Sequence, residues 1–257
     1  MNFEKLQSLD LRDVQHTNDN RFGENLGYNY KNIPIHCVMG IHEAAFSLVE
    51  SLNLKKDSQI LILGAGSGAF DQRLLDNGFS NITAVEFIKD VYKISGTKLF
   101  DLDLSQDFSH LGQYDLVIAI EIIEHLENQF HFIREIKKLL TSTGHLILST
   151  PNAESSFARI KYFIVGELQF FHEDLYLSGH ISPIFRHVLD FNLSQSGLKI
   201  IKVLGNGNLW KRLIFLKYKN IFMIFFCFLL YLISFLELRK DKEHNQNINI
   251  FLIGHSN

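Results

Sequence analysis

A run of four aliphatic residues leads directly into a glycine-rich turn, and this feature most constrains how the chain can fold. The sequence ILIL occupies residues 60–63, and glycines follow at positions 64, 66 and 68. An unbroken aliphatic run is typical of a strand that is buried on both faces of a parallel sheet. Glycines let the backbone turn tightly and approach a ligand, which the next helix can meet with its free N–H groups. We therefore expect an α/β fold that binds a nucleotide-like cofactor.

The spacing of these glycines fits two kinds of cofactor. Gly64-x-Gly66-x-x-Ala69 fits the dinucleotide fingerprint, which accepts alanine at its third position. Gly64-x-Gly66-x-Gly68 fits the corresponding loop of enzymes that use S-adenosylmethionine (SAM). In both, an acidic residue at the end of the second strand accepts hydrogen bonds from the ribose hydroxyls. Residues 81–86 read as that strand, and Glu86 is its acidic end.

Two later blocks separate these alternatives. YDLVIAIEIIEHLEN at 114–128 reads as a strand that runs into a helix, and GHLILSTPN at 144–152 reads as another strand with its exit loop. Here the sequence resembles the class I SAM-dependent methyltransferases. The resemblance is strongest to the branch with the ubiquinone-biosynthesis O-methyltransferases and the small methyltransferases of bacterial surface-polysaccharide clusters. It covers residues 40–204 and a last strand, and a nicotinamide dehydrogenase would not carry these blocks.

The resemblance implies a Rossmann-like sheet of seven strands, with the last strand antiparallel and inserted between the fifth and the sixth. Apolar residues at helical spacing and capping residues predict the helices. The strands are expected near 60–63, 81–86, 98–103, 114–120, 144–150, 199–204 and 248–253, and the helices near 41–52, 70–77, 127–140 and 182–197. The domains would be an N-terminal extension (1–40), the SAM-binding domain (41–204), a hydrophobic membrane-associating insertion (205–246) and the final strand (247–257).

The same resemblance implies which residues hold the cofactor. Gly64, Gly66 and Gly68 would approach the methionine and ribose portions of SAM. Glu86 would hold the ribose hydroxyls, and Asp103 would face the adenine amine. Asp103 is favoured because it leads a D-L-S segment, and Asp101 is the alternative if the register of the strand differs.

Four residues could act on the methyl acceptor. If a helix starts near Glu121, then Glu121, Glu124 and His125 share one helical face, where two carboxylates and an imidazole can bind a divalent cation. Some relatives, among them small-RNA 2′-O-methyltransferases, use such a set with a later histidine, which here would be His180. The cation (magnesium, manganese or zinc) would hold the acceptor oxygen.

Two other readings of this set remain open. Glu124 and His125 could simply cap and pack the helix start. Alternatively, His125 or His180 could act as general base, with Glu121 lining the cleft between SAM and its substrate.

An apolar segment lies between the last two expected strands. Residues 220–236 carry no charge and are flanked by lysines and arginine. As a helix this segment would be about 25 Å long, just short of the hydrocarbon core of a bilayer. A buried helix would be amphipathic, whereas this segment is apolar all round, so we expect membrane contact. Because the flanking strands would share one sheet, the segment cannot cross the membrane once, and we expect an anchor at the cytoplasmic face.

We therefore expect a membrane-associated SAM-dependent methyltransferase that O-methylates a small-molecule or lipid-linked acceptor. The aromatic segment 153–180 would be a lid over the acceptor pocket or a helix pair at the edge of the sheet. The net charge of −3 gives no electrostatic reason to expect nucleic acid as a partner. Two alternatives are a SAM-binding membrane adaptor without turnover and, less favoured, an NAD(P)-dependent Rossmann enzyme.

Overall fold

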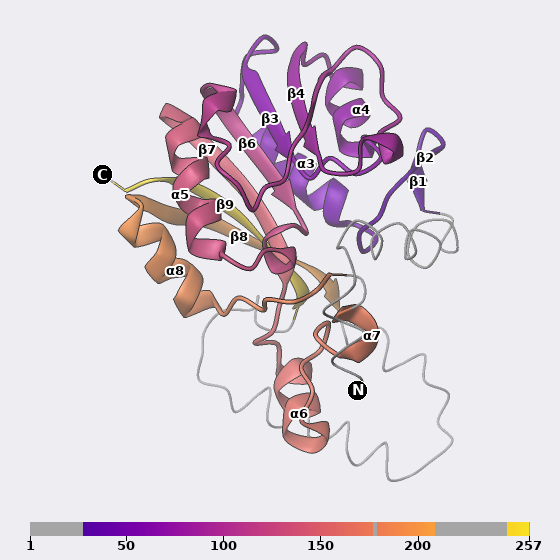
Figure 1. The fold of residues 1–257 in the computed structure, drawn as a ribbon, viewed down its shortest axis with the longest axis vertical. Coiled ribbons are helices and arrows are strands. Elements are labelled where there is room, and N and C mark those ends of the chain that lie inside the picture. The colour runs from indigo at the N-terminus through magenta and orange to yellow at the C-terminus, as the bar shows by residue number, and fades with distance from the viewer. Residues whose placement is uncertain (1–27, 177–178, 209–245, 257) are drawn as a thin grey trace.

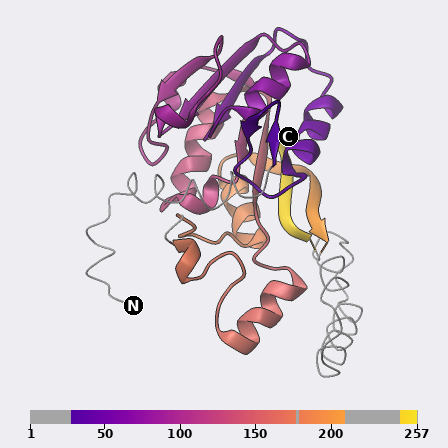
Figure 2. The same ribbon diagram turned by 90° about the vertical axis from the view of Figure 1, so that its right-hand side faces the viewer.

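The computed structural model describes residues 28–176, 179–208 and 246–256, which form a seven-stranded sheet between two layers of helices (Figure 1). In the order in which they pair, its strands are β5 (Lys98–Asp101), β4 (Asn81–Glu86), β3 (Gln59–Leu63), β6 (Tyr114–Ile120), β7 (Leu140–Pro151), β9 (Gln246–His255) and β8 (Leu198–Asn208). Five neighbouring strands are parallel, and β9 is antiparallel to both β7 and β8. The predicted sheet order is confirmed. In Figure 2, β8 and β9 run side by side at one border of the sheet.

Helices cover both faces of the sheet. The helices are α3 (Ile41–Ser51), α4 (Ala69–Asp76), α5 (Gln129–Leu139), α6 (Ser156–Val165), α7 (Glu173–Tyr176) and α8 (Arg186–Gln195), and a small hairpin pairs β1 (Asn29–Tyr30) with β2 (Ile33–Pro34). In β3, Ile60 and Ile62 pack with α3 and α4, whereas Leu61 and Leu63 pack with α5 and α8. All four side chains are at most 3% exposed. Each contributes roughly 1.5–3 kcal/mol when it is removed from water.

Two connections that could each carry an α-helix, residues 87–97 and 102–113, contain none. The chain from β4 to β5 contains only a 3₁₀ turn (Lys89–Val91), and the chain from β5 to β6 contains only another (Ser109–Leu111). The first connection is tied to α4, because the Tyr92 hydroxyl donates to Asp71 Oδ1 at 2.8 Å and lies 2.6 Å from Thr97 Oγ1. Burial raises the pKa of the Asp71 carboxyl to about 7. The first connection therefore depends on side-chain contacts with α4 rather than on the hydrogen bonds of a helix of its own.

Two predicted boundaries are wrong. The strand expected to reach Asp103 ends at Asp101. The helix expected to start at Ser182 starts at Arg186 instead. Ser182 is held elsewhere, because its N–H donates to the Glu124 carbonyl at 3.0 Å and its carbonyl accepts from Gln129 Nε2 at 2.6 Å.

In the described ranges, no helix is both long enough and apolar enough to cross a membrane. The predicted apolar segment 220–236 lies outside these ranges. β8 runs parallel to β7, so its last residue, Asn208, lies at the carboxyl edge of the parallel strands. β9 starts at Gln246 at this same edge.

Candidate active site

The site lies where the order of the strands reverses. From β3 the chain proceeds outward to β4 and β5, and it then returns to the other side of β3 with β6 and β7. In open α/β sheets, ligands bind beyond the carboxyl ends of the strands at such a switch point. The residues that follow these strand ends are the glycine loop after β3 and Glu121 after β6, and Glu86 is the last residue of β4.

Glycine is required at two positions of the loop by its neighbours. Gly64, Gly66 and Gly68 all have positive φ angles, of 68°, 54° and 85°. A Cβ on Gly64 would lie 2.0 Å from Ile122 Cδ1, and one on Gly68 would lie 2.3 Å from Ile94 Cγ1. At Gly66 the nearest atom to such a Cβ is a ring carbon of His36 at 3.7 Å. The backbone is thus packed at the two ends of the loop and more open at its centre, where a cofactor can approach.

Glu86 holds this loop. Its Oε2 accepts from the Gly66 N–H at 2.7 Å, and its Oε1 accepts from the Ile88 N–H at 2.9 Å. The buried carboxylate therefore links the centre of the glycine loop to the end of β4.

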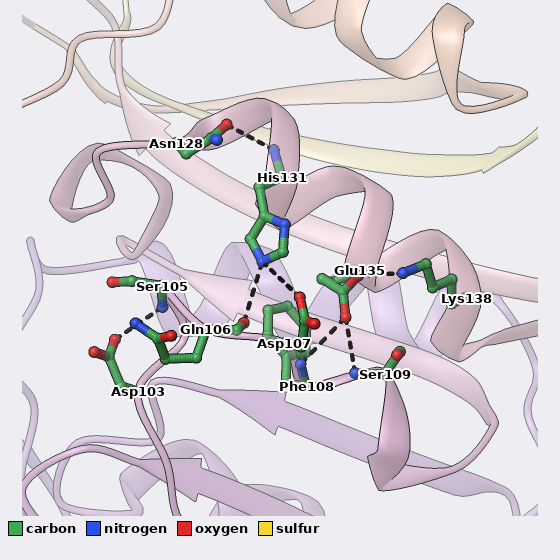
Figure 3. A network of polar contacts seen from close by, with 10 residues as sticks. All are labelled: Asp103, Ser105, Gln106, Asp107, Phe108, Ser109, Asn128, His131, Glu135 and Lys138. Carbon is green, nitrogen blue, oxygen red and sulfur yellow. Dashed lines mark hydrogen bonds and ion pairs between the residues drawn. The ribbon is translucent and has the colours of Figure 1, made fainter.

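The two aspartates near the end of β5 differ in their surroundings. Asp101 is exposed and pairs in register with Glu86 across the strands. Asp103 follows the strand, and its Oδ1 accepts from the Ser105 N–H at 2.8 Å (Figure 3). Asp103 therefore starts a hydrogen-bonded turn at the sheet edge that the resemblance assigns to the adenine.

Glu121 does not begin a helix, contrary to the prediction. It has a positive φ of 52°, which is rare for a residue with a side chain. Its N–H contacts Ser149 Oγ at 3.0 Å and the Ser149 carbonyl at 3.3 Å, and Ser149 Oγ donates to Glu121 Oε1 at 2.7 Å. Burial raises the pKa of the Glu121 carboxyl to about 7. Pairing with β7 therefore holds this residue in a conformation that a helix start would not have.

Glu124 is fully buried in a short 3₁₀ turn, Ile123–His125. Its Oε2 accepts from Thr150 Oγ1 at 3.1 Å, whereas Oε1 has no hydrogen-bond partner among the described residues. Burial, and then the charge of Glu121, raise the pKa of Glu124 well above its ordinary value. A buried carboxylate oxygen without a partner is costly, so this position fits a site completed by a ligand.

His125 and His180 face each other next to this carboxylate. Their ring centroids are 4.8 Å apart, and the rings are close to perpendicular. Gly179 allows this approach, because a Cβ there would lie 2.7 Å from His125 Nδ1. That nitrogen has no partner in the described part of the chain. His180 Nδ1 lies 3.0 Å from the Phe170 carbonyl and must donate to it, which leaves Nε2 with a free lone pair.

Both imidazoles are neutral near pH 7. Burial, and then the nearby His180, lower the pKa of His125 to about 3. Burial also lowers the pKa of His180. Neutral imidazole is the form that binds metal ions, whereas a ring with so low a pKa is a weak general base.

Three of the four residues predicted as metal ligands therefore converge. One ligand atom from each of Glu124, His125 and His180 lies within 4.8 Å of the others. Glu121 is not a member of this group, and its carboxylate accepts a hydrogen bond from Ser149 Oγ instead. A carboxylate with two imidazoles is a common donor set for zinc, iron and manganese. The unpartnered oxygen of Glu124 and nitrogen of His125 show that the residues present fit a cation.

Residues of other elements, which were not predicted, also shape this site. Ser149 and Thr150 lie in the GHLILSTPN block but received no role, although their hydroxyls orient Glu121 and Glu124. Cys37 was also missed. Burial, and then the charge of Glu121, raise the pKa of its thiol, which indicates that it lies near the acidic residues. Only the block of small hydroxyl residues at the end of β7 offered a signal in the sequence.

Comparisons with known proteins agree with this geometry. The ubiquinone biosynthesis O-methyltransferase of Rickettsia conorii is 32% identical over 117 residues, which are 42% of this chain and 40% of that protein. The protein of the same name from Rickettsia typhi is 31% identical over 102 residues, which are 37% of this chain and 41% of that protein. The matches thus span about 40% of the length of these curated relatives.

The fold also matches solved structures. A SAM-dependent methyltransferase from Archaeoglobus fulgidus has a TM-score of 0.55 and 15% identity, and the match covers 84% of this chain and 95% of that one. The family described as "Methyltransferase domain" matches residues 40–203, which are more than half of the chain. The sheet order and the glycine loop at the switch point are those that the resemblance implied. The chain therefore belongs to this methyltransferase family, within the class I SAM-dependent superfamily.

Proposed function

We propose that this enzyme transfers the methyl group of SAM to an oxygen of a small-molecule or lipid-linked acceptor at the membrane surface. The observation that carries this proposal is the buried group of Glu124, His125 and His180, which has unpartnered polar atoms. This group lies directly beyond β6, and Ile122 in the same segment packs against Gly64 of the cofactor loop. The polar atoms that could hold an acceptor oxygen thus lie next to the loop that would hold the methyl donor.

The cofactor would lie across the carboxyl ends of β3, β4 and β5. In this proposal Gly64, Gly66 and Gly68 meet the methionine and ribose portions of SAM. Glu86 accepts from the ribose hydroxyls, and Asp103 faces the adenine amine. The donor methyl group on sulfur is already activated, so the protein mainly has to align acceptor oxygen, methyl carbon and sulfur.

At the acceptor end, Glu124, His125 and His180 would hold a divalent cation such as magnesium, manganese or zinc. A bound cation lowers the pKa of an acceptor hydroxyl and stabilises the alkoxide. Glu121 lies beside this group and adds negative charge when its carboxyl is ionised, above about pH 7. In the absence of a cation, His180 is the better general base of the two histidines, because the pKa of His125 is depressed to about 3.

The topology supports an acceptor that comes from a membrane. β8 and β9 pair in one sheet, so the segment 209–245 leaves and rejoins the fold on the same side, at the carboxyl edge that carries the site. This segment contains the uncharged residues 220–236. α6 follows β7 beyond this same edge (Figure 1), and Tyr162 and Phe163 of α6 are 56% and 89% exposed. We propose an interfacial anchor at the cytoplasmic face, with the aromatic insertion beside the acceptor entrance.

Two classes of acceptor suit this arrangement. Isoprenoid quinone precursors are candidates because the curated relatives are named for ubiquinone biosynthesis. Lipid-linked precursors of surface polysaccharides also present hydroxyl groups at a membrane face. Both offer an oxygen nucleophile that a cation at the site could activate.

Replacing Glu86 with alanine should weaken cofactor binding. The change removes hydrogen bonds to the ribose and the bond that holds the Gly66 N–H, so we expect a loss of roughly 1.5–3 kcal/mol. Calorimetric titration with S-adenosylhomocysteine (SAH) measures this loss. Glu50→Ala is the control, since it removes an exposed carboxylate of α3 that has no proposed role in the site. Tight NAD binding without SAH binding would refute the cofactor assignment.

Purified protein should transfer labelled methyl groups from SAM to a membrane extract. We expect the label in the lipid-soluble fraction, in a bond that resists mild base as an ether does. Boiled protein is the control. If the protein binds SAM but labels no fraction of the extract, the alternative of a SAM-binding adaptor without turnover replaces the proposed enzyme.

Removal of divalent cations should abolish methyl transfer, and added magnesium, manganese or zinc should restore it. Glu124→Gln and His180→Ala should each reduce turnover by at least about 100-fold, because Lewis-acid stabilisation of an alkoxide is worth several kcal/mol. His187→Ala, at an exposed position of α8, is the control. Turnover that is indifferent to chelator, with no metal by elemental analysis, would leave these residues as packing groups or a base.

The protein should remain with membranes after a high-salt wash and leave them only with detergent. Each large apolar side chain of 220–236 contributes roughly 1.5–3 kcal/mol on leaving water, against about 1 kcal/mol for each lysine at the surface. Replacement of Phe225, Leu229 and Leu232 by glutamate should release the protein and leave SAH binding intact. The control replaces Lys217 and Lys219 by glutamine, which should only increase sensitivity to salt. If the apolar triple variant stays bound, residues 220–236 are not the anchor.

A further inference from the structure

We propose that His131 and Glu135 of α5 are positioning residues for the adenine end of the cofactor site. They act through the loop that follows β5, residues 102–112, which contains Asp103. This inference rests on the proposed cofactor role of Asp103 and extends it to a helix that itself lies outside the cofactor loop. No helix of its own stabilises the loop, which contains only the 3₁₀ turn Ser109–Leu111.

Glu135 anchors the far part of the loop (Figure 3). Its Oε2 accepts from the Phe108 N–H at 3.2 Å and from the Ser109 N–H at 2.9 Å, and its Oε1 accepts from Lys138. The residue is only 1% exposed. Burial pushes the pKa of Glu135 upward, but Lys138 and the backbone N–H groups outweigh burial and hold the pKa below its ordinary value. The carboxylate thus remains charged and is fully engaged with protein donors.

His131 anchors the near part of the loop and connects it to Asp103. Its Nε2 lies 3.2 Å from the Gln106 carbonyl, to which it must donate. The Gln106 N–H in turn donates to the Asp103 carbonyl at 3.0 Å. Gln106 therefore joins the histidine of α5 to the aspartate that we propose faces the adenine: its carbonyl contacts His131 (Figure 3), and its N–H donates to Asp103.

The position of α5 itself is set by the acceptor side of the site. Asn128 caps the helix by accepting from the His131 N–H at 2.9 Å, and this cap follows the acidic block within three residues of His125. Gln129, in the first turn, donates to the Ile123 carbonyl at 3.1 Å. The helix α5 thus holds both the backbone next to Glu124 and His125 and the loop that contains Asp103. A rigid link of this kind keeps donor and acceptor in one geometry.

The same residues could be taken for a cation site, but their hydrogen bonds favour the role of loop anchors. Ligand atoms of Asp107, His131 and Glu135 do lie within 4.8 Å of one another. However, both oxygens of Glu135 and the Nε2 of His131 already have protein partners, and Asp107 is 3.6 Å from the same Nε2. The groups are satisfied by the loop that they hold.

The test is a double-mutant cycle between Glu135 and Asp103, read as the Kd for SAH. Glu135→Gln keeps the shape of the side chain and removes its charge, so we expect an increase in Kd of about three- to tenfold. The KM for SAM should rise by the same factor, whereas kcat at saturating SAM should not change. In an Asp103→Ala background, Glu135→Gln should have little further effect on the Kd. The reason is that Glu135 is proposed to act only by positioning Asp103, whose contact with the adenine is already absent.

Controls separate positioning from folding. His131→Ala is the second variant and should show the same coupling to Asp103. Asp190→Asn, which breaks an exposed ion pair on α8, should change neither Kd nor KM. The positioning role would be overturned if the losses of SAH affinity in Glu135→Gln and His131→Ala add to the loss in Asp103→Ala. It would also be overturned if these two variants bind SAH with the Kd of the unmodified protein. Wild-type protein that binds SAH with these couplings but transfers no methyl group would overturn the proposed reaction and leave the positioning role supported.

Discussion

The hydrogen bond from the Gly66 N–H to the Glu86 carboxylate is the contact on which the cofactor edge depends. It joins the loop after β3 to the end of β4, the two places where a nucleotide must be held at once. The loop can place the Gly66 N–H for this bond because its glycines adopt positive φ angles. The strand β3 that carries the loop is fixed by aliphatic side chains on both faces. A charge-assisted bond to a backbone N–H is stronger than a neutral one. The loop is thus shaped before a cofactor arrives.

The segment after β6, which we propose holds the methyl acceptor, rests on a different principle. Here buried polar groups are left incompletely satisfied, and one residue is held in an unfavourable backbone conformation. Glu121 is kept at positive φ by Ser149, while Glu124 and His125 each retain a buried atom without a partner among the described residues. Such features cost stability and persist where surrounding structure imposes them. Their concentration in one segment after β6 distinguishes this segment from the well-satisfied loop on the other side of β3.

Not every connection between successive parallel strands contains an α-helix. Two of the connections have no α-helix, so side chains from neighbouring helices hold their backbones in place. Tyr92 and Asp71 do this for the first connection, and His131 and Glu135 do it for the second. As a result α5 contacts both ends of the site. A helix that packs on the core through Phe132 and Ile136 thereby also carries polar anchors at the neighbouring positions 131 and 135.

The sequence by itself determined which segments form strands and where the cofactor loop lies, because an aliphatic run followed by glycines and acidic residues at strand ends are encoded within short segments. The strand order and the antiparallel β9 were expected from the resemblance to the class I methyltransferases, and the structure confirms them. Only the tertiary structure decided how Glu121, Glu124, His125 and His180 are arranged. The helical spacing of the first three suggested one face of an α-helix. Instead Glu121 has a positive φ and is bonded to Ser149, and Glu124 lies in a 3₁₀ turn and is bonded to Thr150. His180 meets His125 because Gly179 lets two distant segments touch, which no local pattern specifies.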